Sequence, residues 1–185
     1  VAVSNELRKL DSTSSGRPPL ELHYLGPINQ YVRPLEEIGV RLHSIYSYKL
    51  RRYFSLKNIL DIPVFFISLF QAFLKVYALM PDVIFSKGGT SAFSVVLAGW
   101  FFRIPILIHE SDAVPGLNNL LGSRFASRVA VSFESSLNYF KPSQTILVGN
   151  PVREKLLRNI LDPISAKAEL GFSGDKPLLL DLCGS

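Results

Sequence analysis

The stretch that decides the fold is DVIFSKGGTSAFSVVLAGWFFRIPILIHESDAVPGLNN, residues 82–119. It contains two apolar runs, at residues 83–85 and 104–108, and each run ends in a polar loop before a helix-like segment begins. Two successive strand–loop–helix units predict neighbouring parallel strands, because a parallel connection requires such a crossover. In sheets of this kind the loops at the carboxyl ends of the strands line one crevice. We therefore expect a functional site in these two loops.

The remainder of the chain repeats the same alternation. We expect helices at residues 1–10, 30–38, 62–80, 91–102, 117–126, 135–140, 153–160 and 164–170, and strands at 20–25, 40–46, 82–85, 104–108, 128–132, 145–148 and 177–182. This order predicts the α/β class, with a Rossmann-like parallel sheet flanked by helices. Because the chain opens inside a helix-like pattern and stops in a strand-like one, we expect a fragment cut at both ends.

The composition excludes several classes of protein. With 48% hydrophobic and 19% charged residues the chain is globular, and the formal charge of +5 favours anionic partners. No nucleic-acid-binding motif accompanies this charge, so we expect no nucleic-acid partner. The single cysteine, Cys183, forms no internal disulfide, and His23 and His43 lack the spacing of metal ligands. We therefore expect no metal and a reducing compartment.

Residues 62–80 form an unusually apolar segment. Asp61 and Lys75 bracket about thirteen residues without charge, fewer than the roughly 20 that a membrane span requires. Read as a helix, the segment has two apolar stripes: Phe66, Phe70, Phe73 and Tyr77 on one, and Phe65, Leu69 and Val76 on the other. A crossover helix needs only one apolar face. The second stripe is expected to meet another protein surface or a lipid interface.

A basic, aromatic loop precedes this segment. Its cations could meet anionic head groups while aromatic side chains enter the bilayer interface. The side chains predicted to contact the membrane are Phe66, Phe70, Phe73, Trp100, Lys49, Arg51 and Arg52. A core helix beside a solvated positive loop remains the alternative interpretation.

Three local motifs could bind a ligand or carry chemistry. Gly88-Gly89-Thr90 follows a strand and precedes a helix, so it could approach a phosphate, although such a pair also makes an ordinary turn. His109-Glu110-Ser111-Asp112 supplies a base, acceptors and donors in one loop, although its first two residues could simply satisfy backbone groups. The motif at residues 149–153 places an arginine after a turn, where it could reach a diphosphate or lie on the surface.

The order and spacing of KGGT (residues 87–90), HESD (109–112), PGLNN (115–119) and GNPVR (149–153) resemble the N-terminal domain of the MurG family, the peptidoglycan N-acetylglucosaminyltransferases of bacteria. The resemblance implies the acceptor domain of a GT-B glycosyltransferase, with residues 1–170 in that domain and 171–185 forming a linker and the first strand of a donor domain. The family's first strand and first glycine-rich loop would precede Val1.

The activity implied by the resemblance is transfer of N-acetylglucosamine from UDP-N-acetylglucosamine to lipid I, the polyprenyl-diphosphate-linked N-acetylmuramyl-pentapeptide, to give lipid II. Such an enzyme inverts the anomeric centre, uses no cofactor or metal, and sits peripherally on the anionic cytoplasmic face of the cell membrane. The fragment alone is expected to be inactive. The alternative is a non-catalytic, membrane-docking subunit that recruits a separate donor-binding chain.

Carried over residue by residue, the resemblance implies catalytic roles for His109 and Glu110. It implies substrate-binding roles for Gly88, Gly89, Thr90, Asp112, Asn119, Arg153 and Ser185. The two glycines would face the acceptor diphosphate, and the two last residues would approach the donor. At three positions the chain departs from the family's usual Tyr, Asn and Gly, namely Thr90, Asp112 and Cys183.

Overall fold

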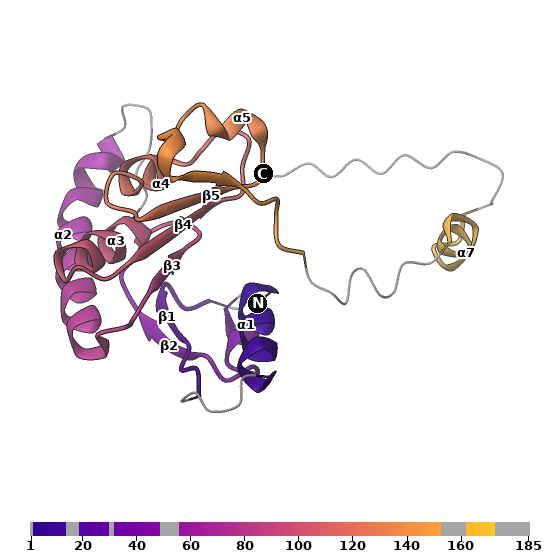
Figure 1. Ribbon diagram of the computed structural model, residues 1–185, viewed down its shortest axis with the longest axis horizontal. Helices are drawn as coiled ribbons and strands as arrows, with labels where there is room; N and C mark the ends of the chain where they lie inside the picture. Colours follow the sequence, from indigo (N-terminus) through magenta and orange to yellow (C-terminus); the bar gives the residue numbers. More distant parts are fainter. Residues whose placement is uncertain (1, 14–18, 30–31, 49–55, 153–161, 173–185) are drawn as a thin grey trace. The chain divides into compact units, whose positions relative to one another are not determined.

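The computed structural model describes residues 2–13, 19–29, 32–48, 56–152 and 162–172 (Figure 1). The chain divides into two compact units, Val1–Pro151 and Val152–Ser185. The domain boundary expected after residue 170 stays a prediction. The expected helix at 153–160, the strand at 177–182 and Cys183 lie outside the described residues.

The first unit is built on a four-stranded parallel sheet in the order β3–β4–β5–β6. Its strands are β3 (Ile84–Ser86), β4 (Ile106–Glu110), β5 (Arg128–Val131) and β6 (Thr145–Leu147). The connections contain α3 (Ala92–Phe101), α4 (Leu117–Gly122), α5 (Glu134–Leu137) and the 3-10 helix η2 (Pro142–Gln144). The predicted Rossmann-like parallel sheet is therefore confirmed, and all four strands end at the same edge.

A second, two-stranded parallel sheet pairs β1 (His23–Gly26) with β2 (Arg41–Ser44), after the helix α1 (Ala2–Thr13). The expected helix at 30–38 is wrong in extent, because only the 3-10 helix η1 (Arg33–Leu35) forms among its described residues. Pro34 fits only the first turn of a helix, and Gly39 at φ +76° ends the segment five residues later. Too few residues remain between them for a stable α-helix.

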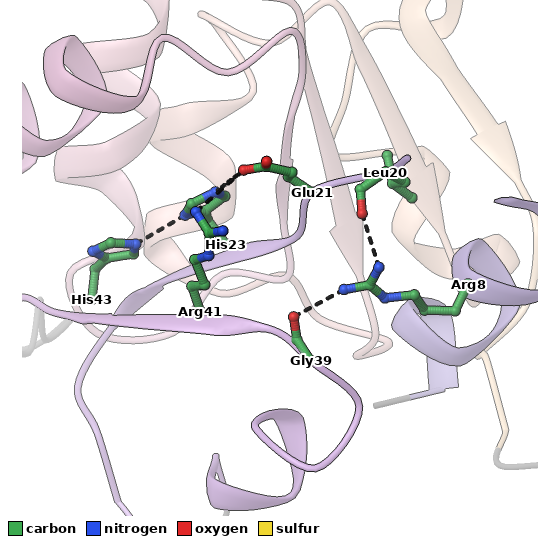
Figure 2. A network of polar contacts seen from close by, with 7 residues as sticks. All are labelled: Arg8, Leu20, Glu21, His23, Gly39, Arg41 and His43. Carbon is green, nitrogen blue, oxygen red and sulfur yellow. Dashed lines mark hydrogen bonds and ion pairs between the residues drawn. The ribbon is translucent and has the colours of Figure 1, made fainter. Parts of the chain in front are cut away.

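Polar contacts tie α1, β1 and β2 together (Figure 2). The guanidinium of Arg8 donates to the carbonyl oxygens of Leu20 and Gly39, both at 2.9 Å. The rings of His23 and His43 lie side by side, with 2.9 Å between Nδ1 of the first and Nε2 of the second. These contacts join segments that are up to 31 residues apart in sequence.

The main core lies on one face of the four-stranded sheet, where α3 is the next layer and α2 (Leu56–Leu79) packs outside α3 (Figure 1). Its buried members are Ile45, Ala72, Val76, Ile84, Val96, Ala98, Ile104, Ile106 and Ile108. Tyr48 attaches the end of the β2 segment to this layer, because its hydroxyl accepts a hydrogen bond from Ser94 of α3 at 3.2 Å. Burial raises the pKa of Tyr48.

The two apolar stripes of α2 have different environments. Val76 is buried in the core, and Phe65 makes ring contacts with Tyr48 and Phe93. On the opposite side Phe66 and Phe70 are 61% and 65% exposed. Within the described chain, residues 62–79 are the one stretch long and apolar enough to cross a membrane by length and composition alone. The helix α2 is thus longer than the uncharged run between Asp61 and Lys75, which is shorter than a membrane span requires. Its inner face, however, packs on a protein core.

In the second unit the structure describes α7 (Pro163–Glu169), as predicted for residues 164–170. The side chain of Asp162 caps this helix by accepting hydrogen bonds from the backbone N–H groups of Ile164 and Ser165. The hydrogen bonds from Ser165 lower the pKa of Asp162.

Candidate functional site

The loop between β3 and α3 requires unusual backbone conformations. Gly88 and Gly89 have φ angles of +78° and +90°, in the left-handed region that glycine adopts without strain. Ser91 at the N-cap of α3 also has a positive φ, and its side chain caps no backbone N–H of the helix. The first N–H groups of α3 therefore have no side-chain cap, and a Cβ on Gly89 would meet nothing within 4 Å.

Glu110, the last residue of β4, organises the neighbouring loop. One carboxylate oxygen accepts from the backbone N–H of Asp112 at 2.9 Å, and the other accepts from Gly116 N at 3.0 Å and from Asn119 Nδ2 at 3.0 Å. Glu110 is 3% exposed. The carboxylate thus closes the 111–116 loop and holds the start of α4, which matches the simpler interpretation of this residue in the sequence.

The first turn of α4 holds the glycine loop in place. Asn119, 5% exposed, lies so close to Gly88 that a Cβ there would be 2.6 Å from Asn119 Oδ1. The neighbouring Asn118 donates from Nδ2 to the carbonyl oxygen of Gly89. The structure therefore brings the half-buried Gly88 against the buried cluster of Glu110 and Asn119, although they come from three different segments.

His109 lies on the other face of the sheet from this cluster, because successive side chains of a strand point to opposite faces. Its Nε2 is 3.1 Å from the carbonyl oxygen of Gly149, and its Nδ1 is 3.3 Å from Ser111 Oγ. The ring also lies near that of Phe85, with 6.3 Å between their centroids. The two residues predicted as a catalytic pair therefore contact different partners.

The remaining predicted site residues differ in exposure, and two of them are not described by the structure. The side chain of Asp112 is exposed, while its carbonyl oxygen accepts a hydrogen bond from Ser136 Oγ at 2.7 Å. Thr90 is half-buried beside the glycines. Arg153 and Ser185 lie outside the described residues.

The predicted membrane-contact side chains are only partly described. Phe66, Phe70 and Trp100 are exposed, but Phe73 is half-buried and makes ring contacts with Phe101 and Phe102. Phe101 is itself exposed. Lys49, Arg51 and Arg52 lie outside the part of the chain that the structure describes.

Several residues that shape the site had no individual role predicted from the sequence. Asn118, Ser136 and the backbone of Gly116 hold the loops, and Gly149 receives His109 from 40 residues away. Their type alone carries no signal, since Asn, Ser and Gly are ordinary loop residues. Among the residues searched, which are those the structure describes, no group of three or more His, Cys, Asp or Glu side chains could hold a metal ion.

Comparison with known proteins gives one family match. The model of the glycosyltransferase family 28 N-terminal domain matches residues 1–131. A relative from Bacillus anthracis, named UDP-N-acetylglucosamine--N-acetylmuramyl-(pentapeptide) pyrophosphoryl-undecaprenol N-acetylglucosamine transferase 2, is 44% identical over 151 residues, which make up 82% of this chain and 42% of the relative. A second relative, from Legionella pneumophila (strain Lens), has the same name without the final 2. It is 39% identical over 166 residues, which make up 89% of this chain and 45% of the relative.

Two solved structures have a similar fold. The crystal structure of Acinetobacter baumannii MurG matches with a TM-score of 0.57 and 27% identity, over 83% of this chain and 41% of that one. A putative UDP-N-acetylglucosamine 2-epimerase from Listeria monocytogenes matches with a TM-score of 0.53 at 11% identity, over 78% of this chain and 41% of that one, which is a likeness in fold alone. The chain thus spans less than half the length of these curated relatives.

Proposed function

Because the chain belongs to glycosyltransferase family 28, whose N-terminal domain it contains, we propose that it is the acceptor-binding part of an N-acetylglucosaminyltransferase. Its fold is that of the Rossmann-like N-terminal domain of a GT-B enzyme. In the proposed reaction N-acetylglucosamine passes from UDP-N-acetylglucosamine to undecaprenyl-diphosphate-linked N-acetylmuramyl-pentapeptide (lipid I), and the products are lipid II and UDP. The names of the two relatives support this pair of substrates.

The observation that carries the proposal is the placement of the glycine loop against the Glu110–Asn119 cluster. The loop precedes a helix whose first N–H groups have no side-chain cap, and Gly89 faces open space. Free N–H groups at a helix N-terminus suit a phosphate, so the acceptor diphosphate is proposed to lie at Gly88, Gly89 and Thr90. Asn119 fixes this loop from the side, because its amide contacts Gly88 and is held by Glu110.

Three residues are proposed to bind the donor. The exposed carboxylate of Asp112 would accept hydrogen bonds from sugar hydroxyl groups, and Arg153 and Ser185 would contact UDP-N-acetylglucosamine. His109 and Glu110 remain the residues on which transfer is expected to depend. Glu110 would act by holding the loop, since its carboxylate already accepts three hydrogen bonds within the chain.

Two experiments test this function. The first titrates the purified chain with a short-chain lipid I analogue and follows the amide NMR signals of Gly88 and Gly89, which are expected to shift at saturable concentrations. The second measures transfer of labelled N-acetylglucosamine to lipid I by the full-length protein that contains this chain. A full-length protein that folds but transfers no sugar to lipid I would refute the proposed activity, and normal transfer by Glu110→Ala would refute the role of that residue.

We also propose that the exposed side of α2 contacts the cytoplasmic face of an anionic membrane. Phe66 and Phe70 are exposed on α2, Trp100 is exposed on α3, and residues 62–79 are apolar throughout most of their length. Amphipathic aromatic side chains enter the boundary between head groups and acyl chains, while cations outside it attract anionic lipids. Lys49, Arg51 and Arg52 would supply those cations.

The membrane proposal is tested by co-sedimentation with vesicles of phosphatidylglycerol and phosphatidylcholine. The double variant Phe66→Ser/Phe70→Ser is expected to bind at least tenfold more weakly, because it removes two apolar rings from the lipid interface. Phe133→Ser is the matched control, since Phe133 is an exposed aromatic residue of the first unit outside α2. Equal vesicle binding by the double variant and the unchanged chain would contradict the proposal.

A further inference from the structure

Both ring nitrogens of His109 have hydrogen-bond partners within the first unit. Nε2 is 3.1 Å from the carbonyl oxygen of Gly149, and Nδ1 is 3.3 Å from the hydroxyl of Ser111. Because a carbonyl oxygen only accepts hydrogen bonds, Nε2 carries a proton and donates. In the neutral ring Nδ1 is then unprotonated, and it accepts from Ser111. These two contacts select one tautomer.

The strand register explains how the ring reaches Gly149. His109 on β4 pairs with Ala130 on β5, and Ala130 pairs with Ile146 on β6, so the three side chains form a row on one face of the sheet. Gly149 follows the end of β6, three residues after Ile146. The small side chain of Ala130 leaves room for the imidazole to extend over β5 toward that turn.

The turn at Gly149 needs an external restraint. Gly149 has φ +77°, a conformation that glycine leaves easily because it has no Cβ, and a Cβ built there would meet nothing within 4 Å. The last backbone hydrogen bond before it joins Val148 N to Val131 O at 2.9 Å. Two residues later, at Pro151, the first compact unit ends.

A proton-transfer role for His109 fits these contacts poorly. The ring is 4% exposed, and the nitrogen that could act as a base is occupied by Ser111. A general base must lie within hydrogen-bond reach of the proton that it removes. The contacts instead place the ring between the end of β4 and the exit of β6.

We infer that His109 is a positioning residue: its Nδ1 accepts a hydrogen bond from Ser111 while its Nε2 donates one to the Gly149 carbonyl oxygen, and this donation holds the turn through which the chain leaves the first unit. Restraining this turn would limit the conformations of Gly149 and Asn150, and binding of the donor substrate is proposed to depend on that restraint. The contact itself stands without the proposed function, but its role in sugar transfer rests on that function.

The contact is tested by NMR on the purified chain. The sequence has three histidines, so the ring ¹⁵N signals of His109 are assigned by their loss in His109→Gln. Of the two neutral tautomers, the one protonated at Nε2 is expected. An Nδ1-protonated ring would overturn the inference, and this measurement needs no variant other than the one used for assignment.

The restraint is tested by backbone relaxation at Gly149 and Asn150. Order parameters there are expected to fall from about 0.85 in the unchanged chain to below about 0.6 in His109→Ala. His109→Gln is the matched variant, because its side-chain amide can still donate to the Gly149 carbonyl and is expected to restore the higher value. Unchanged order parameters in a folded His109→Ala would overturn the inference.

The role in transfer is tested in the full-length protein. A positioning role predicts that His109→Ala keeps the shape of the pH–rate profile and loses activity mainly through a higher KM for UDP-N-acetylglucosamine, and that His109→Gln, which can still donate to Gly149, restores the lower KM. A general base predicts instead a loss of about 10²-fold to 10⁴-fold in kcat and the disappearance of one limb of the pH profile, which would overturn the positioning role. Absence of transfer by the unchanged protein would refute the proposed function, while the NMR result would still decide the contact.

Discussion

Replacing Gly88 by alanine tests whether the glycine loop and the Glu110–Asn119 cluster form one packed unit. The new Cβ would lie 2.6 Å from Asn119 Oδ1, 2.7 Å from Nδ2 and 2.9 Å from Cγ. Real Cβ atoms do not approach other atoms so closely, so the amide has to move. Its movement would break the hydrogen bond from Asn119 to the buried carboxylate of Glu110. Gly89→Ala is the matched control, because Gly89 has a similar positive φ but open space around its Cβ position.

The expected losses follow from the contacts. Both substitutions place an L residue in the left-handed region, which costs about 1–2 kcal/mol of the free energy of unfolding. Gly88→Ala adds the loss of a hydrogen bond to a charged group, about 1.5–3 kcal/mol. We therefore expect a total loss of about 2.5–5 kcal/mol for Gly88→Ala and about 1–2 kcal/mol for Gly89→Ala.

Urea unfolding at pH 7.5 measures both losses, and the side-chain amide signals of Asn119 report the local change. Those signals are expected to shift in Gly88→Ala and to stay in place in Gly89→Ala. The close packing of Gly88 against Asn119 would be refuted if the two variants lost the same free energy of unfolding, to within about 0.5 kcal/mol, and the Asn119 signals did not shift. A double variant with Asn119→Ala refines the test, because removing the amide is expected to recover the steric part of the Gly88→Ala loss.

Three further perturbations give definite expectations. Tyr48→Phe leaves the buried Ser94 hydroxyl without its acceptor, so urea unfolding should show a loss of about 1–3 kcal/mol, and a loss below about 0.5 kcal/mol would contradict the contact. The pKa of His43 is lowered, chiefly by burial and then by the charge of His23. The contribution of His43 to the free energy of unfolding is therefore complete above pH 6.5 and is lost as the pH falls through the lowered pKa. Between pH 7.5 and 5, the free energy of unfolding should depend less on pH in His43→Gln than in the unchanged chain. Asp162→Ala removes the cap of α7, so the helical circular dichroism signal at pH 7 should fall. In the unchanged chain the same loss of signal should appear only as the pH drops below 3.8, through the lowered pKa of Asp162.

Much of the sheet could be predicted from the sequence. The apolar runs before KGGT and HESD, and those at 128–132 and 145–148, became β3, β4, β5 and β6 with small shifts of their ends. Apolar runs separated by amphipathic segments have few other arrangements that bury them, so local pattern was sufficient. It was insufficient at residues 30–38, where Pro34 and the nearby Gly39 limit the helix to a single 3-10 turn.

The contacts within the candidate site could not be predicted in the same way. HESD suggested that His109 and Glu110 act as a pair, yet one donates to Gly149 and the other accepts from Gly116 and Asn119. A strand alternates its faces, so neighbours in sequence are separated by the sheet. Which partner each face meets depends on helices and turns that are distant in sequence.

The sequence by itself therefore determined the class of the fold, the parallel direction of its strands and the edge at which polar loops gather, because these follow from local periodicity and chain connectivity. It also showed that α2 has two apolar stripes. Only the tertiary structure decided that Val76 faces the core while Phe66 and Phe70 face outward, and that Gly88 lies against Asn119. Periodicity states which side chains share a face, whereas hydrogen bonds and close packing depend on positions of a few tenths of an ångström that only the assembled elements define.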